Sequence, residues 1–193
     1  MNARNGRIIS GKYRGKKIPL DNNPAIRPTT DRVKETMFNI LQHSYANNLK
    51  GIVLDLFAGS GSLGIECLSR GSAGVIFADK NPQAIIGIKK FVNSMNFDGF
   101  AEFITGDSLH INLSKIAIFQ EEQLIKKISL VFLDPPYEST LVEDSLNLLL
   151  QCKILQEDCI FVVESSKDLK INNLKLNQAK IMGKTIIKIY QLK

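Results

Sequence analysis

The chain has few of the side chains that build disulfide frameworks and metal centres. Its 193 residues include three cysteines and two histidines, and no two cysteines stand in a CxxC spacing. An odd number of cysteines without that spacing argues against a disulfide scaffold and against a structural zinc site. Two histidines are too few for a histidine-based metal centre. We therefore expect no metal and a reducing, cytoplasmic setting.

Long apolar runs are also missing. No stretch approaches the roughly 18 apolar residues that a membrane span needs. The N-terminus is basic but lacks the apolar core, about 7–15 residues long, of a secretory signal. Apolar residues make up 44% of the chain and charged residues 23%, as in an ordinary globular protein. The length predicts one domain with a small extension, and we expect a monomer without a membrane partner.

Positive charge is concentrated near the N-terminus. The net charge is +6, and residues 1–34 alone contain nine basic and two acidic residues, a net charge of +7. Clustered lysine and arginine neutralise backbone phosphates and release counterions, which gives sequence-independent affinity for nucleic acid. A solubilising tail is the alternative interpretation. The candidate phosphate contacts in this arm are Arg7, Lys12, Arg14, Lys16 and Lys17.

The pattern of apolar residues predicts an N-terminal extension over 1–28 and an α/β domain over 29–193. The extension should form short strands over 7–10 and 16–20, and a helix should run from the capping residues 29–31 to about residue 45. The domain then alternates strands with helices. Strands are expected over 51–57, 73–79, 101–107, 128–134 and 159–165, helices before residue 70 and over 81–95, 109–127 and 140–150, and a closing hairpin over 174–181 and 184–192. This alternation predicts a doubly wound, mostly parallel sheet with an antiparallel C-terminal hairpin.

A glycine-rich turn follows the first strand of that sheet. The segment 55–64, DLFAGSGSLG, contains a GxGxxG pattern between a strand and a helix, where glycines let the backbone approach a ligand. Asp55 lies inside the strand end, where a carboxylate would repel a pyrophosphate but would tolerate the ammonium group of an amino acid. This favours S-adenosylmethionine over a nicotinamide dinucleotide.

Two further strands also end in acidic residues. Asp79 ends the second strand, where its carboxylate can accept both ribose hydroxyls, and Asp107 with Ser108 ends the third, where it can meet an adenine edge. Three acidic strand ends beside the glycines describe a pocket for S-adenosylmethionine. The expected cofactor contacts are Asp55, Phe57, Gly59, Gly61, Asp79, Asp107 and Ser108.

The fourth strand ends in Asp134, Pro135, Pro136 and Tyr137. Proline has no N–H and a fixed φ, so the strand-end carbonyls stay available as acceptors. The exocyclic amine of a nucleobase is a poor nucleophile because its lone pair is delocalised. The Asp134 carboxylate and the Pro135 carbonyl can accept its two hydrogens and aim the lone pair at a sulfonium methyl group. The Tyr137 ring can stack on a base that has been flipped out.

Together these motifs resemble the RsmD-type 16S ribosomal RNA guanine-N2 methyltransferases. The resemblance rests on RPTTDRVKETMFNIL (27–41), DLFAGSGSLGIECLSRG (55–71), GD (106–107) and FLDPPY (132–137), and it covers nearly the whole chain. It implies a class I methyltransferase fold with a Rossmann-like seven-stranded sheet, S-adenosylmethionine as cofactor, and ribosomal RNA as partner. The implied product is the N2-methylated form of one guanine, numbered 966 in the usual scheme.

By position, the resemblance also assigns Arg27, Thr29 and Arg32 to the mouth of the pocket and residues 134–137 to the target base. One departure is Asp79, where similar proteins usually have glutamate. A DNA adenine-N6 methyltransferase is the closest alternative, although such an enzyme usually needs a separate recognition domain. An NAD-dependent oxidoreductase and an inactive RNA-binding module are more distant alternatives, and both conflict with Asp55 and with the DPPY segment.

Overall fold

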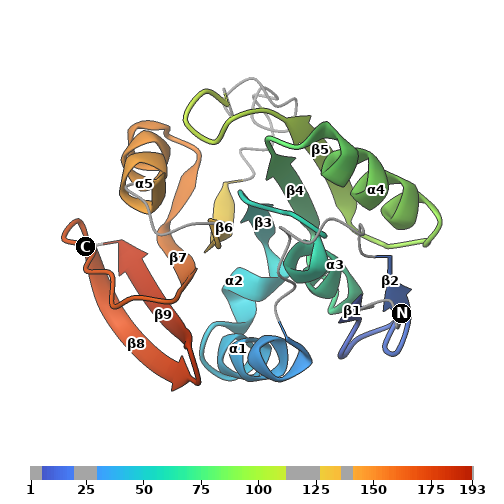
Figure 1. Cartoon of the computed structure of the whole chain (residues 1–193), viewed down its shortest axis with the longest axis horizontal. Helices are drawn as coiled ribbons and strands as arrows, with labels where there is room; N and C mark the ends of the chain where they lie inside the picture. The colour runs from blue at the N-terminus through green and yellow to red at the C-terminus, as the bar shows by residue number, and fades with distance from the viewer. Residues whose placement is uncertain (1–5, 20–29, 112–126, 136–140, 193) are drawn as a thin grey trace.

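A seven-stranded sheet with the strand order β5-β4-β3-β6-β7-β9-β8 forms the centre of the protein (Figure 1). The computed structural model describes residues 6–19, 30–111, 127–135 and 141–192. Strands β3 to β7 pair in parallel, whereas β9 is antiparallel to both β7 and β8. The strands are β3 (Ile52–Asp55), β4 (Gly74–Asp79), β5 (Phe100–Thr105), β6 (Ile128–Leu133), β7 (Leu155–Ser165), β8 (Leu174–Met182) and β9 (Thr185–Leu192). The predicted doubly wound sheet with a C-terminal hairpin is confirmed.

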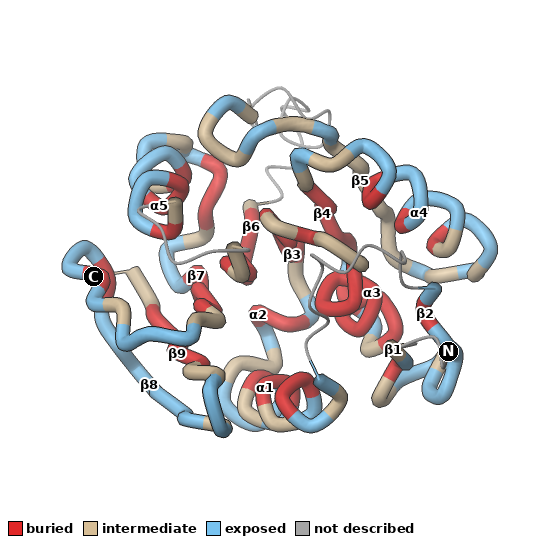
Figure 2. Tube along the Cα trace, viewed as in Figure 1, coloured by how far each residue is buried: buried red, intermediate tan, exposed pale blue. Residues whose placement is uncertain are grey.

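Helices cover both faces of this sheet. The elements outside the sheet are α1 (Asp31–Ser44), α2 (Ala46–Lys50), α3 (Ser62–Ser69), α4 (Pro82–Asn93), α5 (Leu141–Gln151), and the two-residue strands β1 (Gly6–Arg7) and β2 (Lys17–Ile18). Helices α1, α3 and α4 pack on one face, which we call the α1 side, and α5 packs on the other. The central strands are apolar on both faces because both are covered, and Figure 2 shows them as buried.

The predicted first helix is present with the expected cap. The Thr30 hydroxyl accepts a hydrogen bond from the backbone N–H of Val33, at 3.4 Å, and α1 begins at Asp31. Its apolar residues Val33, Met37 and Leu41 recur at helical spacing and are buried. In α4, Asn81 caps the first turn and Pro82 follows it, where the missing N–H of proline costs no helical hydrogen bond.

The N-terminal strands are shorter than predicted. Pairing is limited to Gly6 with Ile18 and Arg7 with Lys17. Beyond these pairs, the chain folds through a turn between Gly11 and Gly15, which have φ angles of 85° and 84°. Ile8 and Ile18 are nonetheless fully buried and belong to the core on the α1 side. The described part of the extension therefore shares its core with the α/β domain.

Other differences are local. β7 begins at Leu155, four residues earlier than predicted, and the short helix α2 was not predicted. The helix expected over 109–127 falls largely outside the described residues, at 112–126. Within the part of the chain that the structure describes, no helix is long and apolar enough to cross a bilayer. No group of three histidine, cysteine, aspartate or glutamate side chains in the described ranges could hold a metal ion.

Candidate active site

Three of the predicted acidic positions meet at the carboxyl edge of the parallel strands. Asp55 pairs with Phe77 of β4 and with Phe132 of β6, and Asp134 lies two residues after Phe132, directly after the end of β6. Side chains alternate between the two faces of a sheet. Val53, Phe77 and Phe132 point to the α1 side, so Asp55, Asp79 and Asp134 share that side. The edge therefore brings the predicted cofactor and target-base residues together on one face.

The turn between β3 and α3 requires its glycines. Gly59 and Gly61 have φ angles of 52° and 73°, in the left-handed region that side chains with a Cβ avoid. Gly61 is also the N-cap of α3, and a Cβ there would meet the side chain of Ile88 at 2.8 Å. The turn thus lies at a helix N-terminus, where the helix dipole favours polar or negatively charged parts of a ligand.

Asp55 lies beneath this turn. Its carboxylate is buried and accepts a hydrogen bond of 3.0 Å from the backbone N–H of Gly64, in the first turn of α3. Because Gly61 has no side chain to cap the helix, Asp55 supplies an acceptor from the neighbouring strand. Burial, together with the nearby Asp79 carboxylate, raises the pKa of Asp55 to about 7, against the opposing effect of the Gly64 hydrogen bond. A cationic ligand group would favour its charged form.

Asp79 fixes the same turn from the end of β4. One of its oxygens accepts from the backbone N–H of Gly59 at 2.7 Å, and the other accepts from that of Asn81 at 2.8 Å. A carboxylate has about four acceptor sites, so two hydrogen bonds leave room for ligand hydroxyls. Asp79 therefore holds the cofactor turn in shape and remains able to accept from a ribose.

The remaining predicted cofactor residues surround this pair. The backbone N–H of Gly106 donates to the Asp79 carbonyl at 3.0 Å, which places the loop after β5 beside the end of β4. In that loop, Asp107 is exposed and accepts from the N–H of Leu109, while the Ser108 hydroxyl lies 3.2 Å from that of Ser145 in α5. Phe57 is half-buried and packs against the core on the α5 side.

Asp134 and Pro135 are half-buried at the end of β6. The other residues predicted at the target base and at the pocket mouth, namely Pro136, Tyr137, Arg27 and Thr29, lie outside the described residues. Arg32 is exposed in the first turn of α1. The structure therefore gives a backbone position for half of the DPPY segment and for one of the three residues expected at the pocket mouth.

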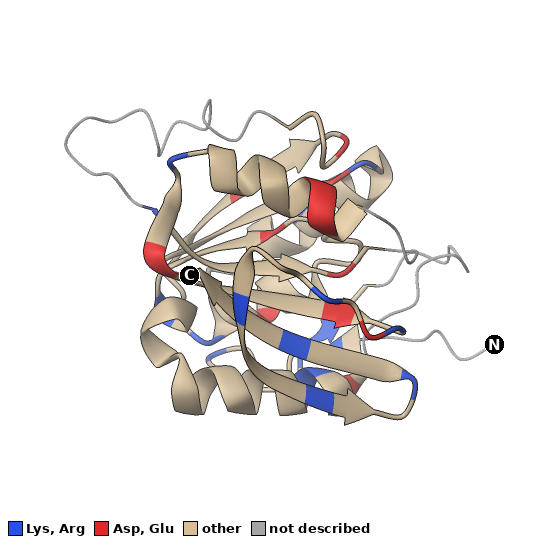
Figure 3. Ribbon diagram, turned by 90° about the vertical axis from the view of Figure 1, so that its left-hand side faces the viewer, with Lys and Arg blue, Asp and Glu red and all other residues tan. Residues whose placement is uncertain are grey.

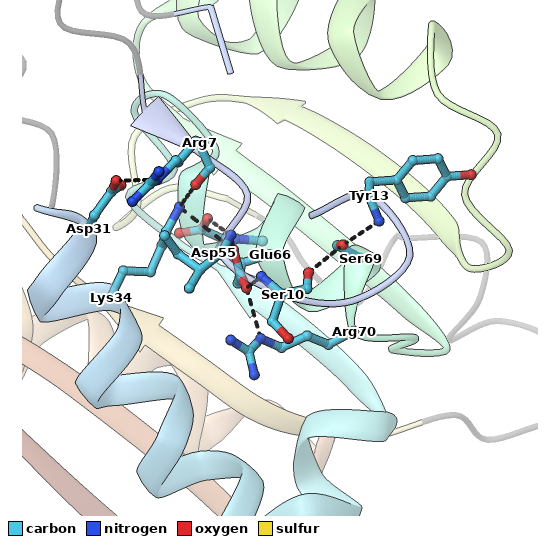
Figure 4. A network of polar contacts seen from close by, with 11 residues as sticks. Arg7, Ser10, Tyr13, Asp31, Lys34, Asp55, Glu66, Ser69 and Arg70 are labelled. Carbon is cyan, nitrogen blue, oxygen red and sulfur yellow. Dashed lines mark hydrogen bonds and ion pairs between the residues drawn. The ribbon is translucent and has the colours of Figure 1, made fainter. Parts of the chain in front are cut away.

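A fully buried glutamate that sequence reasoning missed connects the N-terminal extension to α3. Glu66 accepts hydrogen bonds from the backbone N–H groups of Ile9 and Ser10 at 2.7 and 2.9 Å, and from the Arg70 guanidinium at 2.8 Å (Figure 4). The buried ammonium of Lys34 lies 3.7 Å from the same carboxylate and donates to the Arg7 carbonyl at 2.5 Å. A glutamate inside the apolar segment LGIECL, four residues before an arginine, was the available signal.

Contacts of the extension then continue along α3, away from the glycine turn. The N–H of Lys12 donates to the carbonyl of Ser69, the last residue of α3, and the N–H of Tyr13 donates to the Ser69 hydroxyl. A Cβ at Gly11 would clash with that same carbonyl. Tyr13 also packs on Phe97, just before β5 begins. The turn with its basic residues therefore lies at the amino edge of the sheet, about 12 Å along α3 from the cofactor turn.

The predicted RNA contacts therefore fall into two groups, one on this turn and one near the start of α1. Lys12, Arg14 and Lys16 are exposed on the turn, and Lys12 forms an ion pair with Asp98 at 3.0 Å. Arg7 of β1 lies opposite Lys17 of β2 in the strand register. The Arg7 side chain also forms an ion pair with Asp31 at the start of α1, at 2.7 Å. Of the predicted RNA contacts that the structure describes, Arg7, Lys17 and Arg32 are thus close to the start of α1.

Comparison with known proteins agrees with this geometry. The family described as Conserved hypothetical protein 95 matches residues 6–191. The chain belongs to this family. Ribosomal RNA small subunit methyltransferase D of Escherichia coli K12 is 33% identical over 189 residues, which are 96% of this chain and 89% of that protein. The protein of the same name from Haemophilus influenzae is 35% identical over 188 residues, or 96% and 93% of the two chains.

Solved structures support the fold of this family member. A candidate methyltransferase of Escherichia coli superposes with a TM-score of 0.76 at 29% identity, covering 98% of both chains. An RNA methyltransferase of Salinibacter ruber, crystallised with S-adenosyl-L-homocysteine, gives a TM-score of 0.62 at 15% identity and covers 86% of this chain and 94% of that one. The predicted class I methyltransferase fold and the RsmD-type family are confirmed.

Proposed function

We propose that this family member transfers a methyl group from S-adenosylmethionine to the exocyclic N2 amine of a guanine in 16S ribosomal RNA, in the cytoplasm. One observation carries the proposal: Asp134 and Pro135 follow β6 directly beside β3, whose glycine turn is held by Asp79. The carboxyl edge therefore combines acceptors for an amine with a turn suited to a nucleoside ligand. The names of the relatives, ribosomal RNA small subunit methyltransferase D, support RNA of the small subunit as substrate.

The residues at this edge fit the cofactor. Asp79 can accept from ribose hydroxyls, buried Asp55 can face an ammonium group, and the turn at Gly59–Gly61 brings the backbone close to a ligand without a Cβ in the way. When bound, S-adenosylmethionine supplies an activated methyl group on a sulfonium. The work left to the protein is to hold the amine in line with that methyl at about 3–3.5 Å.

Asp134 and Pro135 would perform that positioning. In the proposed mechanism, the Asp134 carboxylate and the Pro135 carbonyl accept the two hydrogens of the guanine amine. The nitrogen then becomes pyramidal, and its lone pair points at the methyl carbon. As the nitrogen accepts the methyl group that bound S-adenosylmethionine would supply, Asp134 or water would take the excess proton from it. Tyr137 would stack on the flipped base.

The test is methyl transfer to defined RNA. Small-subunit ribosomal RNA from cells that lack this gene should accept tritiated methyl from S-adenosylmethionine, and nuclease digestion followed by mass spectrometry should locate one N2-methylguanine. RNA from cells that carry the gene should accept little. Methylation of adenine N6 in DNA instead would replace the proposal with the DNA alternative, and absence of transfer to either substrate would reject both.

A further inference from the structure

The C-terminal hairpin is a second strongly basic element of the molecule. Residues 165–193 contain seven lysines and one acidic residue, a net charge of +6. The intervening residues 35–164 contain nine basic and sixteen acidic residues, a net charge of −7. The net charge of residues 35–193 is therefore close to zero because an acidic part and a basic part offset each other. Figure 3 shows lysine positions along β8 and at the hairpin turn.

Strand register places the tip of this hairpin at the carboxyl edge of the sheet. Ser165, the last residue of β7, pairs with Ile186 at the start of β9, and Thr185 pairs with Met182 at the end of β8. Because β7 is parallel to β6, this end of the hairpin lies at the same edge as Asp134. Lys184 is in the connecting turn, so it lies at that edge as well.

Lys180 is level with Asp134 across the sheet. Leu133 pairs with Val163, and the next register position holds Glu164, Ile187 and Lys180 on successive strands. Three strand spacings separate β6 from β8, which corresponds to about 15 Å. An RNA strand with its target base at Asp134 has to extend over such a distance on either side of that base.

Lys180 also lies on the same side of the sheet as the active-site carboxylates. It pairs with Ile187, whose side chain is buried in the core on the α1 side. Arg32, in the first turn of α1, is exposed on that side too. Lys180 and Lys184 are both exposed, and neither forms an ion pair within the described residues. Lys12 and Arg7 of the N-terminal arm, by contrast, each bind a carboxylate.

Protection of a sheet edge explains these lysines only in part. β8 is an edge strand, and lysines on edge strands discourage pairing with other chains. That role would account for Lys175 and Lys180 equally, because both are exposed and both lie on the α1 side of β8. It does not require Lys184, which lies in the turn outside the strand ladder.

We propose that Lys180 and Lys184 contact backbone phosphates of the substrate RNA next to the target guanine. The inference rests on the proposed function and extends it to the surface that holds the RNA. The RNA would cross the carboxyl edge on the α1 side, between Arg32 and the tip of the hairpin. RNA is the expected ligand of this surface because the exposed tip is basic and a nucleic-acid backbone carries one negative charge per phosphate.

Lys175 offers a matched control for this proposal. It is exposed on the same strand and the same side but lies near the amino edge, opposite Gln191, five residues before Lys180. The parent protein, Lys180→Gln/Lys184→Gln and Lys175→Gln would be compared. Binding of unmethylated small-subunit ribosomal RNA, free and within small subunits, would be measured by filter binding between 50 and 200 mM salt. Methyl transfer would be measured in parallel, and calorimetry with S-adenosyl-L-homocysteine would verify the fold.

The double variant should bind RNA more weakly, and the slope of log K against log salt should fall by about 1.4, or 0.7 for each lost phosphate contact. Its rate at saturating RNA and its cofactor affinity should not change, and Lys175→Gln should behave like the parent. An unchanged slope, or an equal change in Lys175→Gln, would overturn the proposal and leave edge protection as the explanation. If the parent binds this RNA but does not methylate it, the proposed function fails while the binding data still decide about the lysines.

Discussion

The carboxylate of Glu66 and the backbone N–H of Ile9 meet at 2.7 Å inside the protein, although 57 positions separate them in the sequence. This hydrogen bond joins the N-terminal extension to the helix that begins at the cofactor turn. Lys34 of α1 completes the cluster, since it contacts both Glu66 and the Arg7 carbonyl. One buried carboxylate therefore contacts the extension, α1 and α3 together.

Replacement of Glu66 by alanine should destabilise the fold strongly. Removal of one partner from a buried ion pair leaves the other charges unpaired, and such changes cost about 3–5 kcal/mol. Here Arg70 and two backbone N–H groups would lose their acceptor, and buried Lys34 would lose its counter-charge. Urea unfolding should show this loss, whereas Glu157→Ala, which removes an exposed charge, should change stability by less than about 0.5 kcal/mol. Equal losses in the two variants would contradict the assigned role.

The raised pKa of Asp55 predicts a pH-dependent stability of the cofactor-free protein. Burial keeps Asp55 protonated in the folded state up to about pH 7, while an ordinary aspartate in the unfolded chain releases its proton near pH 3.8. The folded state thus binds more protons in this interval. The contribution of Asp55 to stability is present below pH 3.8 and is lost as the pH rises towards 7, by roughly 1.4 kcal/mol per unit at most.

Asp55→Asn should remove that dependence. The amide oxygen can still accept from the Gly64 N–H but does not titrate. In urea unfolding between pH 5 and 8, the free energy of unfolding of the variant should rise relative to that of the parent as the pH rises. Above about pH 8 the difference between the two should be constant. Asp144→Asn, at an exposed position of α5, serves as the control. A difference between parent and Asp55→Asn that does not vary with pH would mean that Asp55 is charged throughout.

Asp79 should affect both cofactor binding and stability. Asp79→Ala removes the acceptor of the Gly59 and Asn81 N–H groups, which are partly buried, so the loss should stay below the roughly 1–3 kcal/mol of a fully buried unpaired donor. Asp79→Asn retains one acceptor oxygen, so it should lose less stability and still bind the cofactor more weakly. Calorimetry with S-adenosyl-L-homocysteine and urea unfolding would measure the two effects. Parent-like affinity in both variants would reject a ribose contact at Asp79.

Much of this architecture could be predicted because it depends on short-range patterns. Continuous apolar strands, glycines at a strand–helix turn and a proline in the first turn of α4 each have a local physical cause. The acidic strand ends could be grouped because parallel strands end at one edge. The role of Glu66 could not be predicted in the same way, since its partners at Ile9 and Ser10 are distant in sequence and are backbone groups without a side-chain signal.

The N-terminal strands were predicted too long for the same reason. Ile9 and Ser10 look like strand residues, but their N–H groups donate to Glu66 and not to a partner strand. The position of the basic turn also depends on long-range contacts, with Ser69 and Phe97. Net charge could indicate a basic arm, but only the packing on α3 shows that Lys12, Arg14 and Lys16 lie at the amino edge.

That position predicts unequal effects of charge reversal in the arm. The full reversal of Lys12, Arg14, Lys16 and Lys17 to glutamate should flatten the salt dependence of RNA binding. When the arm is divided, Lys17→Glu/Arg32→Glu, near the start of α1, should have a larger effect than Arg14→Glu/Lys16→Glu, on the turn at the amino edge. Filter binding over a salt series would measure both pairs. Equal effects would place the turn in the RNA contact, and cofactor affinity should stay constant in every variant.

Asp134 should act mainly on the rate of methyl transfer. If it accepts a hydrogen from the amine as the nitrogen becomes pyramidal, its contribution is larger in the transition state than in the ground state. Asp134→Ala should then lower the single-turnover rate on a guanine-containing RNA fragment by about 10²–10³-fold, with little change in cofactor or RNA binding. Asp134→Asn keeps one acceptor oxygen but adds an NH₂ donor, so its rate should be intermediate. Tyr137→Phe retains a ring that can stack on the base, so it should change the rate only slightly. Tyr137→Ala should weaken binding of the target base. A rate for Asp134→Ala within about twofold of the parent would mean that the DPPY segment is only a structural turn, and amine positioning by Asp134 would have to be abandoned.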